Sequence, residues 1–169
     1  MILSNLRERF AECRRSAWRF EAQPTYTMPG EQEELELWRA GEPMPDDFNS
    51  AWHGRVAGYV ERGVSVGRVR VVRRPFTEYL RHQFDWVIPG NTRAGEDVRI
   101  LDVTDVELEL PDQDFWIFDD EIVVDLNFNP DGTLINLEQQ ENPDLSTYRK
   151  WRDTALAHAV PFSDFHAGT

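Results

Sequence analysis

The hydrophobic positions of the first sixty residues switch between helical and strand spacing. A first helix is predicted by apolar residues at helical intervals, namely Leu6, Phe10, Cys13 and Ala17. The stretch AWRFEAQPTY then alternates apolar and polar residues as a strand does, and Pro24 ends it. Acidic residues at the start of PGEQEELELWRAG predict a second helix, because the helix dipole favours them there. A third helix is expected from about Phe48 to Arg62.

The middle of the chain changes to a strand, helix, strand pattern. VGRVRVV is rich in β-branched residues, PFTEYLRHQFDWV carries an apolar residue every three to four positions, and EDVRIL again reads as a strand. Such a unit implies two parallel strands joined by a right-handed crossover. Residues 105–111, DVELELP, also alternate, so we expect a further strand or edge segment there.

The last third of the chain predicts a hairpin, a turn and a helix. FWIF and IVVDLNF flank Asp119 and Asp120 as two apolar strands, NPDG turns the chain into TLINL, and LSTYRKWRDTAL carries an apolar helical stripe. We therefore predict one α/β domain over residues 1–169, with a mixed β-sheet flanked by helices. Residues 1–50 form a helix–strand–helix segment packed on the α/β core of residues 52–160.

Composition narrows the class of protein. Six Trp and ten Phe can fill a single core, and one cysteine excludes an internal disulfide framework and any multi-cysteine metal site. No apolar run approaches the ~20 residues that cross a bilayer, and the N-terminus becomes polar too early for a signal peptide. We expect a cytoplasmic protein without membrane contact.

Charge is unevenly distributed along the chain. The net charge of −13 disfavours direct binding of nucleic acid, since phosphate contacts need a surplus of Lys and Arg. Residues 55–99 hold nine Arg against five acids, whereas residues 100–148 hold fourteen acids and no Lys or Arg. Two interpretations stay open. One is a pair of solvated faces, and the other is an Arg-lined anion pocket or a basic partner docked on the acidic half.

The arginines of the strand pattern are the first candidates for ligand binding. Arg68 and Arg70 share one face of their strand. If Arg99 on the neighbouring strand points the same way, three guanidinium groups converge on a carboxylate or phosphate. The alternative is internal pairing with Asp102 or Glu96.

The predicted hairpin supplies the other candidates. Trp116 would offer a stacking surface and Asp119 would border the cleft, while Asp120 or His82 would act as a general base in an enzyme. The structural interpretation makes both aspartates turn-formers and leaves His82 exposed. The acids match no calcium loop and the four His are dispersed, so neither a metal nor a cofactor is predicted.

The order of elements from Trp52 onward resembles one half of a phospholipase D-like fold, over roughly residues 52–160. It is carried by RGVSVGRVRVV, AGEDVRIL, DFWIFDDEIVV and YRKWRDTALAHA. In that superfamily a strand ending in Asp carries the motif His-x-Lys-x(4)-Asp, in which His is the nucleophile and Lys a phosphate ligand. The resemblance thus implies where a catalytic motif would stand.

That motif is absent from this chain. Aligning Asp119 with the motif Asp places Asp112 at the His position and Asp114 at the Lys position, and aligning Asp120 gives Gln113 and Phe115. A carboxylate would repel the phosphodiester that the motif binds. The resemblance therefore implies a catalytically empty form of the fold, a pseudoenzyme.

A second resemblance covers nearly the whole chain. SAWRFEAQPTY, LWRAGEP, VRVVRRPFTEYLR, AGEDVRIL and DFWIFDDEIVV together resemble an uncharacterised domain family of actinomycetes, a domain of unknown function often encoded beside a helix-turn-helix regulator. The resemblance implies a cytoplasmic accessory protein in a regulatory or toxin–antitoxin-like locus. It brings no catalytic residues.

Two functions are expected from these observations. The leading one is a non-catalytic binding or regulatory protein that acts with a helix-turn-helix regulator or another basic protein. Such a partner would complement the acids Asp105, Glu107, Glu109 and Asp112. The alternative is an enzyme, a hydrolase or transferase, or a sensor that binds an anionic small molecule in an Arg-lined cleft.

Overall fold

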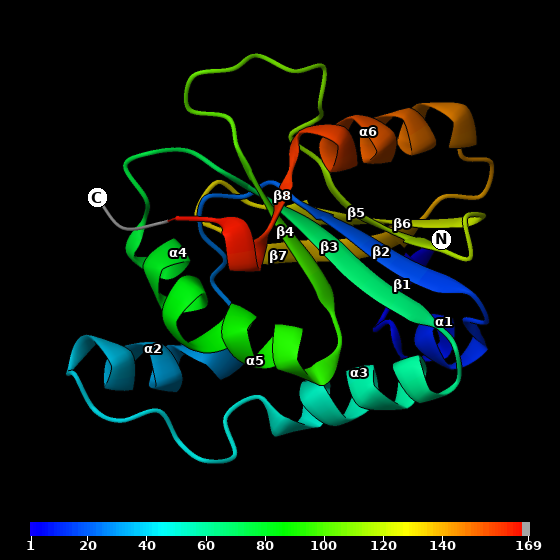
Figure 1. The fold of residues 1–169 in the computed structure, drawn as a ribbon. Helices are drawn as coiled ribbons and strands as arrows, with labels where there is room; N and C mark the ends of the chain where they lie inside the picture. Colours follow the sequence, from blue (N-terminus) through cyan, green and yellow to red (C-terminus); the bar gives the residue numbers. More distant parts are fainter. Residues whose placement is uncertain (167–169) are drawn as a thin grey trace.

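A computed structural model describes residues 1–166 as an eight-stranded sheet covered by helices on both faces (Figure 1). The strands lie in the order β1-β7-β6-β5-β2-β3-β4-β8. Helices α2, α3, α4 and α5 lie on one face and α6 lies on the other (Figure 1). The predicted mixed sheet flanked by helices is confirmed.

The bounds of the elements are as follows. The strands are β1 Ile2–Leu3, β2 Ser16–Glu21, β3 Ser65–Val72, β4 Asp97–Asp102, β5 Asp114–Phe118, β6 Ile122–Phe128, β7 Leu134–Gln139 and β8 Val160–Pro161. The helices are α1 Arg7–Glu12, α2 Gln32–Arg39, α3 Ser50–Glu61, α4 Glu78–His82, α5 Ile88–Ala94 and α6 Leu145–His158. A π-helical turn, η2 Gln83–Val87, joins α4 to α5, and short 3-10 turns occur at η1 Pro29–Glu31 and η3 Phe162–Asp164.

The centre of the sheet is parallel and its flanks are antiparallel. β3 and β4 pair in parallel across the crossover α4–α5, which confirms the predicted strand–helix–strand unit. β2 also pairs in parallel with β3, and on its other side it pairs antiparallel with β5. The N-terminal segment of residues 1–50 therefore supplies a strand to the middle of the sheet, rather than only covering the core.

Each face of the sheet has its own apolar core. On the face of α3, Phe10 packs against Tyr59 and Trp116, with ring centroids 5.4 and 5.1 Å away. On the face of α6, Phe20 stacks on Phe115 at 5.4 Å, and both side chains are fully buried. Alternate residues of β2 and β5 thus point into different cores, as a strand requires.

The predicted hairpin is confirmed. β5 and β6 pair antiparallel around Asp119 and Asp120, whose φ angles are 52° and 62°. Three residues, Asp119 to Glu121, lie between the paired Phe118 and Ile122, and Glu121 N donates to Phe118 O at 3.0 Å. Asp tolerates the left-handed conformation better than most residues.

Two predicted elements differ from the structure. The first helix ends at Glu12, so Cys13 adopts an extended conformation and Ala17 belongs to β2. No strand forms between Val103 and Asp114, because Leu108 and Leu110 pack on the core beside α6 without pairing with a neighbouring strand. Within residues 1–166 there is no helix with the length and apolar composition needed to span a bilayer.

Candidate ligand-binding site

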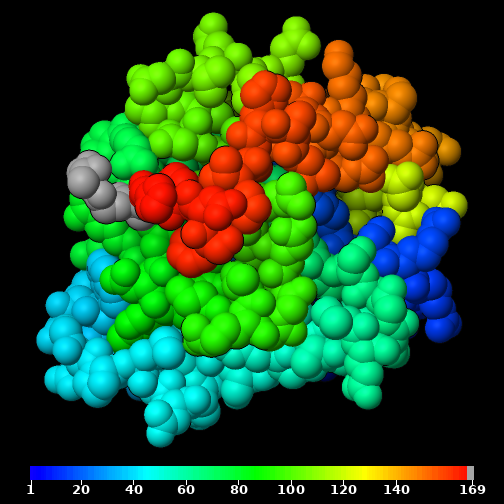
Figure 2. Space-filling view, viewed as in Figure 1, coloured from blue at the N-terminus to red at the C-terminus, as the bar shows by residue number. Residues whose placement is uncertain are grey.

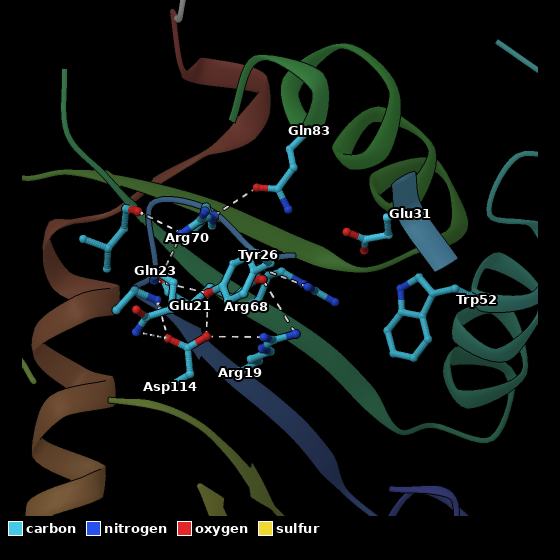
Figure 3. Close-up of polar contacts among 12 residues, drawn as sticks. Arg19, Glu21, Gln23, Tyr26, Glu31, Trp52, Arg68, Arg70, Gln83 and Asp114 are labelled. Carbon is cyan, nitrogen blue, oxygen red and sulfur yellow. Dashed lines mark hydrogen bonds and ion pairs between the residues drawn. The ribbon is translucent and has the colours of Figure 1, made fainter. Parts of the chain in front are cut away.

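A cavity of about 690 Å³ opens on the face of the sheet that α3, α4 and α5 cover. Its floor comes from β2, β3 and β5, and its sides come from α3, α4, η2 and the segments around α1 and Tyr26. Figure 3 shows the charged side chains of the floor gathered around Tyr26, with Trp52 at one side. Three strands from distant parts of the sequence therefore share one polar surface.

Strand register places the central side chains in one row. Arg19 lies opposite Arg68 in the parallel pair and opposite Trp116 in the antiparallel pair. All three line the cavity. The period of two along each strand then puts Glu21 beside Arg70 in the next row.

Glu21 holds the two arginines of the first row together. Its carboxylate lies 3.0 Å from Arg68 Nη1 and 3.7 Å from Arg19 Nη1. Burial alone would raise the pKa of Glu21, but the charges of Arg68 and Arg19 outweigh it and lower that pKa to about 2. Glu21 is therefore ionised at neutral pH although it is 3% exposed.

A second buried carboxylate, Asp114, closes the other end of this network. It is completely buried and accepts hydrogen bonds from the Tyr26 hydroxyl, from Ala22 N at 2.8 Å and from Arg19 Nη2 at 3.3 Å. The carboxylate thus fixes the chain where β2 ends and the Tyr26 segment begins (Figure 3). A buried charge with this many donors is stabilised, whereas one without them is costly.

Two indole rings hold Arg68 from the sides. Its guanidinium carbon lies 5.9 Å from the ring centres of both Trp52 and Trp116. Glu96 accepts from Arg68 Nε at 2.6 Å and from Trp52 Nε1 at 3.3 Å, so it orients both groups. Among the described residues, Arg68 Nη2 has no hydrogen-bond partner. The plane of this guanidinium is therefore fixed, and the N–H groups of Nη2 are available to bind a ligand.

The electrostatic balance of the cavity favours an anion by a small margin. Four arginines line it, Arg7, Arg19, Arg55 and Arg68, against the carboxylates Glu21 and Glu31. Arg7 and Arg55 form no ion pair with a described residue. With the buried Arg70, Glu96 and Asp114 included, five arginines face four carboxylates. A ligand with one negative charge would suit this surplus.

The structure separates the three arginines that the sequence had brought together. Arg68 lines the cavity, and Arg70 lies fully buried behind it, donating to Gln83 at 3.0 Å. Arg99 is paired with Val69 in register, so it lies on the opposite face of the sheet and contacts Asp97 at 3.2 Å. The expected convergence of Arg99 with the other two is wrong, because the parallel register sets it one residue out of step.

Asp119 has a structural role, because it holds the chain where β2 begins. Its carboxylate accepts hydrogen bonds from the backbone N–H groups of Arg14, Arg15 and Ser16, at 2.9, 2.6 and 3.1 Å. Burial would raise the pKa of Asp119, but these three N–H groups lower it to about 2. Asp119 does not line the cavity.

Asp120 also lies outside the cavity, where it forms ion pairs with Arg149 and Arg152 of α6. Burial would raise its pKa, but Arg152 and then Arg149 lower it. A carboxylate held in its charged form by two arginines is a weak proton acceptor. The geometry therefore gives no support to Asp120 as a general base.

His82 is buried instead of exposed, contrary to expectation. It is 4% exposed and lies among three aromatic rings, with centroids 5.7 Å from Trp38, 6.1 Å from Phe48 and 5.4 Å from Trp86. Burial lowers the pKa of His82. The reason is tertiary: α2 and the loop before α3 cover a helix face that the sequence alone leaves open.

Several residues of the site were not identified from the sequence. They are Arg19, Glu21, Tyr26 and Trp52. Glu96 was predicted as an internal partner of the arginines, and its ion pair with Arg68 confirms that alternative. One signal was present, because WRFE alternates two aromatic residues with two charged ones, and a strand with an apolar and a charged face predicts a polar surface above the sheet. No pattern in the sequence indicated that Trp52 would meet Arg68. In the described part of the chain, no cluster of three or more His, Cys, Asp or Glu is placed to hold a metal ion.

Comparison with known proteins gives a family and a fold. The family model described as "Domain of unknown function (DUF6879)" matches residues 4–167. Among solved structures, the crystal structure of a phospholipase D family member, Nuc from Salmonella typhimurium, is similar, with a TM-score of 0.51 and 15% identity over 91% of this chain and 86% of that one. No curated protein sequence matches the chain. At this identity the likeness shows the fold alone, and the expected phospholipase D-like architecture is confirmed.

Proposed function

This chain belongs to the DUF6879 domain family, and we propose that it is a non-catalytic sensor that binds a small ligand through one negatively charged acid group in the central cavity. The observation that carries the proposal is the row of Trp116, Arg19 and Arg68 on the cavity floor. Trp116 is 3% exposed and forms part of the floor beside the guanidinium groups, and Arg68 Nη2 keeps its N–H donors for an acid group.

We propose a non-catalytic role because neither Asp120 nor His82, the two expected general bases, lines the central cavity, and because Glu31, which does line it, already accepts a hydrogen bond from Tyr79. The carboxylate of Glu21 is ion-paired on two sides, and Asp120 lies outside the cavity. The His-x-Lys motif of the phospholipase D superfamily has no counterpart in the sequence. We place this activity in the cytoplasm as part of the same proposal.

Aromatic dye binding tests the proposed anion site. The probes are 8-anilinonaphthalene-1-sulfonate, an aromatic monoanion, and N-phenyl-1-naphthylamine, which has the same rings without the sulfonate. We expect the folded protein to bind the sulfonate dye at one site, more tightly than the neutral dye. The measurement is dye fluorescence, with quenching of tryptophan emission because Trp52 and Trp116 line the cavity.

Charge reversal at the cavity rim supplies the variant for that test. Arg55→Glu should weaken binding of the sulfonate dye by roughly five- to tenfold and leave the neutral dye unchanged. Arg62→Glu is the matched control. Arg62 is also exposed and comes directly after α3, the helix that carries Arg55, but it does not line the cavity. Equal binding of both dyes, or equal binding by both variants, would contradict the anion site.

A second proposed function is docking of a basic protein on the acidic loop between β4 and β5. Asp105, Glu107, Glu109 and Asp112 are all exposed, and Lys150, at 3.8 Å from Glu109, is the one cation paired with them among residues 1–166. The loop stands at the top of the molecule beside α6 (Figure 2). A groove of about 630 Å³ runs beneath it, with Leu108 and Leu110 in its wall. A basic segment with an apolar side chain would fit this surface, and a helix-turn-helix regulator is the proposed partner.

Co-purification across ionic strength tests the partner. We expect a helix-turn-helix regulator, the proposed partner, to be retained at low salt and released at high salt, because exposed charges are screened. The double variant Glu107→Lys, Asp112→Lys should lose the complex, while Glu33→Lys on exposed α2 should keep it. Absence of a complex at low salt would rule the partner out.

A further inference from the structure

A smaller chamber of about 160 Å³ lies beside the central cavity. Four residues line both spaces, Glu31, Asn49, Tyr79 and Val87. The remaining wall of the chamber includes Glu34 from α2, His82 from α4 and Phe48. A ligand in the central cavity therefore has a neighbouring space into which one end can extend.

Two shielded polar atoms on side chains that line this chamber lack partners. Glu34 Oε2 and His82 Nε2 are both shielded from solvent, and neither forms a hydrogen bond with any residue from 1 to 166. Buried polar atoms are nearly always hydrogen-bonded, since an unsatisfied one costs the full desolvation penalty. Glu34 and His82 come from different helices and both line the chamber. The two unpaired atoms are turned away from the open space, and a small rotation of each side chain would bring both to a single group placed there.

The Tyr79 and Asn49 donors of the chamber are already engaged, whereas the imidazole of His82 forms no hydrogen bond with a described residue. The Tyr79 hydroxyl donates to Glu31 Oε2 at 2.7 Å, and Asn49 Nδ2 donates to Asn91 Oδ1 at 2.9 Å. Burial lowers the pKa of His82, which favours the neutral imidazole with one acceptor nitrogen. What remains is acceptor capacity next to a carboxylate and the ring of Phe48. A primary ammonium, with three donors and a positive charge, is the group that matches this set.

We propose that the ligand of this protein is a zwitterion whose ammonium group lies in the chamber between Glu34 and His82 while its acid group faces the arginines of the central cavity. This inference rests on the proposed anion site and names the chemical class of its ligand, an amino acid or short peptide. It agrees with the near balance of five arginines and four carboxylates around the cavity, which a ligand of high net charge would disturb.

Calorimetric titration with matched compounds tests the inference. The probes are the free L-amino acids and glycyl dipeptides, each beside its analogue without the amine and its analogue without the acid. We expect at least one amine-bearing acid to bind, and its deaminated analogue to bind about tenfold or more weakly, since a charged hydrogen-bonded group is lost.

Two variants locate the amine. Glu34→Gln should lower the affinity for the parent compound to that of its deaminated analogue, whereas Glu36→Gln, which is exposed on the same helix, should leave both affinities unchanged. Circular dichroism melting of both variants shows whether the fold is kept. A Glu34→Gln variant that still discriminates as the wild type does would overturn the inference.

The possible outcomes test the ammonium site and the anion site separately. Deaminated acids that bind as tightly as their parents would overturn the ammonium site and leave the anion site standing. Amines that bind without any need for the acid group would support the chamber and overturn the anion site. If no compound of the panel binds, the zwitterion is wrong, and the sulfonate dye then decides the anion site by itself.

Discussion

Replacing Asp114 with alanine should lower the free energy of unfolding by about 3–5 kcal/mol, the cost of removing one partner from a buried ion pair. The reason is the set of donors that this carboxylate satisfies. Without it, the Tyr26 hydroxyl and the Ala22 N–H would lose their acceptor inside the protein, and Arg19 would keep only the longer ion pair with Glu21. The measurement is chemical denaturation followed by tryptophan fluorescence.

The control for this prediction lies two residues away. Asp112 is exposed and its side chain accepts no hydrogen bond from a described residue, so Asp112→Ala should change stability by less than about 0.5 kcal/mol. Asp114→Asn should fall between the two, because the amide keeps an acceptor oxygen but loses the charge opposite Arg19. Equal stability of the two alanine variants would show that the network around Asp114 is solvated in solution.

Replacing Glu21 with glutamine should remove roughly 3 kcal/mol of stability near neutral pH, and this loss should disappear in acid. The pKa of Glu21 is lowered from 4.5 to about 2 in the folded protein. A lowered pKa means that the contribution is fully present above the unfolded value and is lost as the pH falls through about 2.

Urea denaturation at about pH 7, 4 and 2.5 measures this difference between the wild type and Glu21→Gln. The two stabilities should converge as the pH falls. Asp119 also has a pKa of about 2, but it titrates in both proteins and cancels in the comparison. The free energy of unfolding of Glu33→Gln, a change at an exposed position, should differ from that of the wild type by the same small amount at all three pH values. A constant gap between Glu21→Gln and the wild type would mean that Glu21 is not the group that titrates.

The fold was largely predictable because its signals are local. The alternation of VGRVRVV, the helical spacing after it and the two apolar runs around Asp119 each depend on residues close together in the chain. DVELELP carried the same alternation yet formed no strand, since pairing needs a free sheet edge and β8 occupies the outer side of β4. The alternation of apolar and polar residues shows which face of a segment is apolar. It does not show which strand, if any, the segment pairs with.

The candidate site was less predictable because it depends on strand register. Arg68 and Trp116 were identified from the sequence, but the residues between them were not, and Arg99 was placed on the wrong face. A shift of one residue in a parallel pair reverses the face of every side chain in the neighbouring strand. Sequence spacing contains no information on that shift.

The sequence by itself determined the class of fold, the hairpin with its two aspartates, and the absence of the His-x-Lys motif, since each follows from residue types at short spacing. Only the tertiary structure decided that Arg19 and Arg68 stand in one row beside Trp116, that Glu21 and Asp114 hold them, and that His82 closes a buried chamber. The physical reason is that ion pairing and burial depend on distances between segments far apart in the chain, and the order of the strands sets those distances.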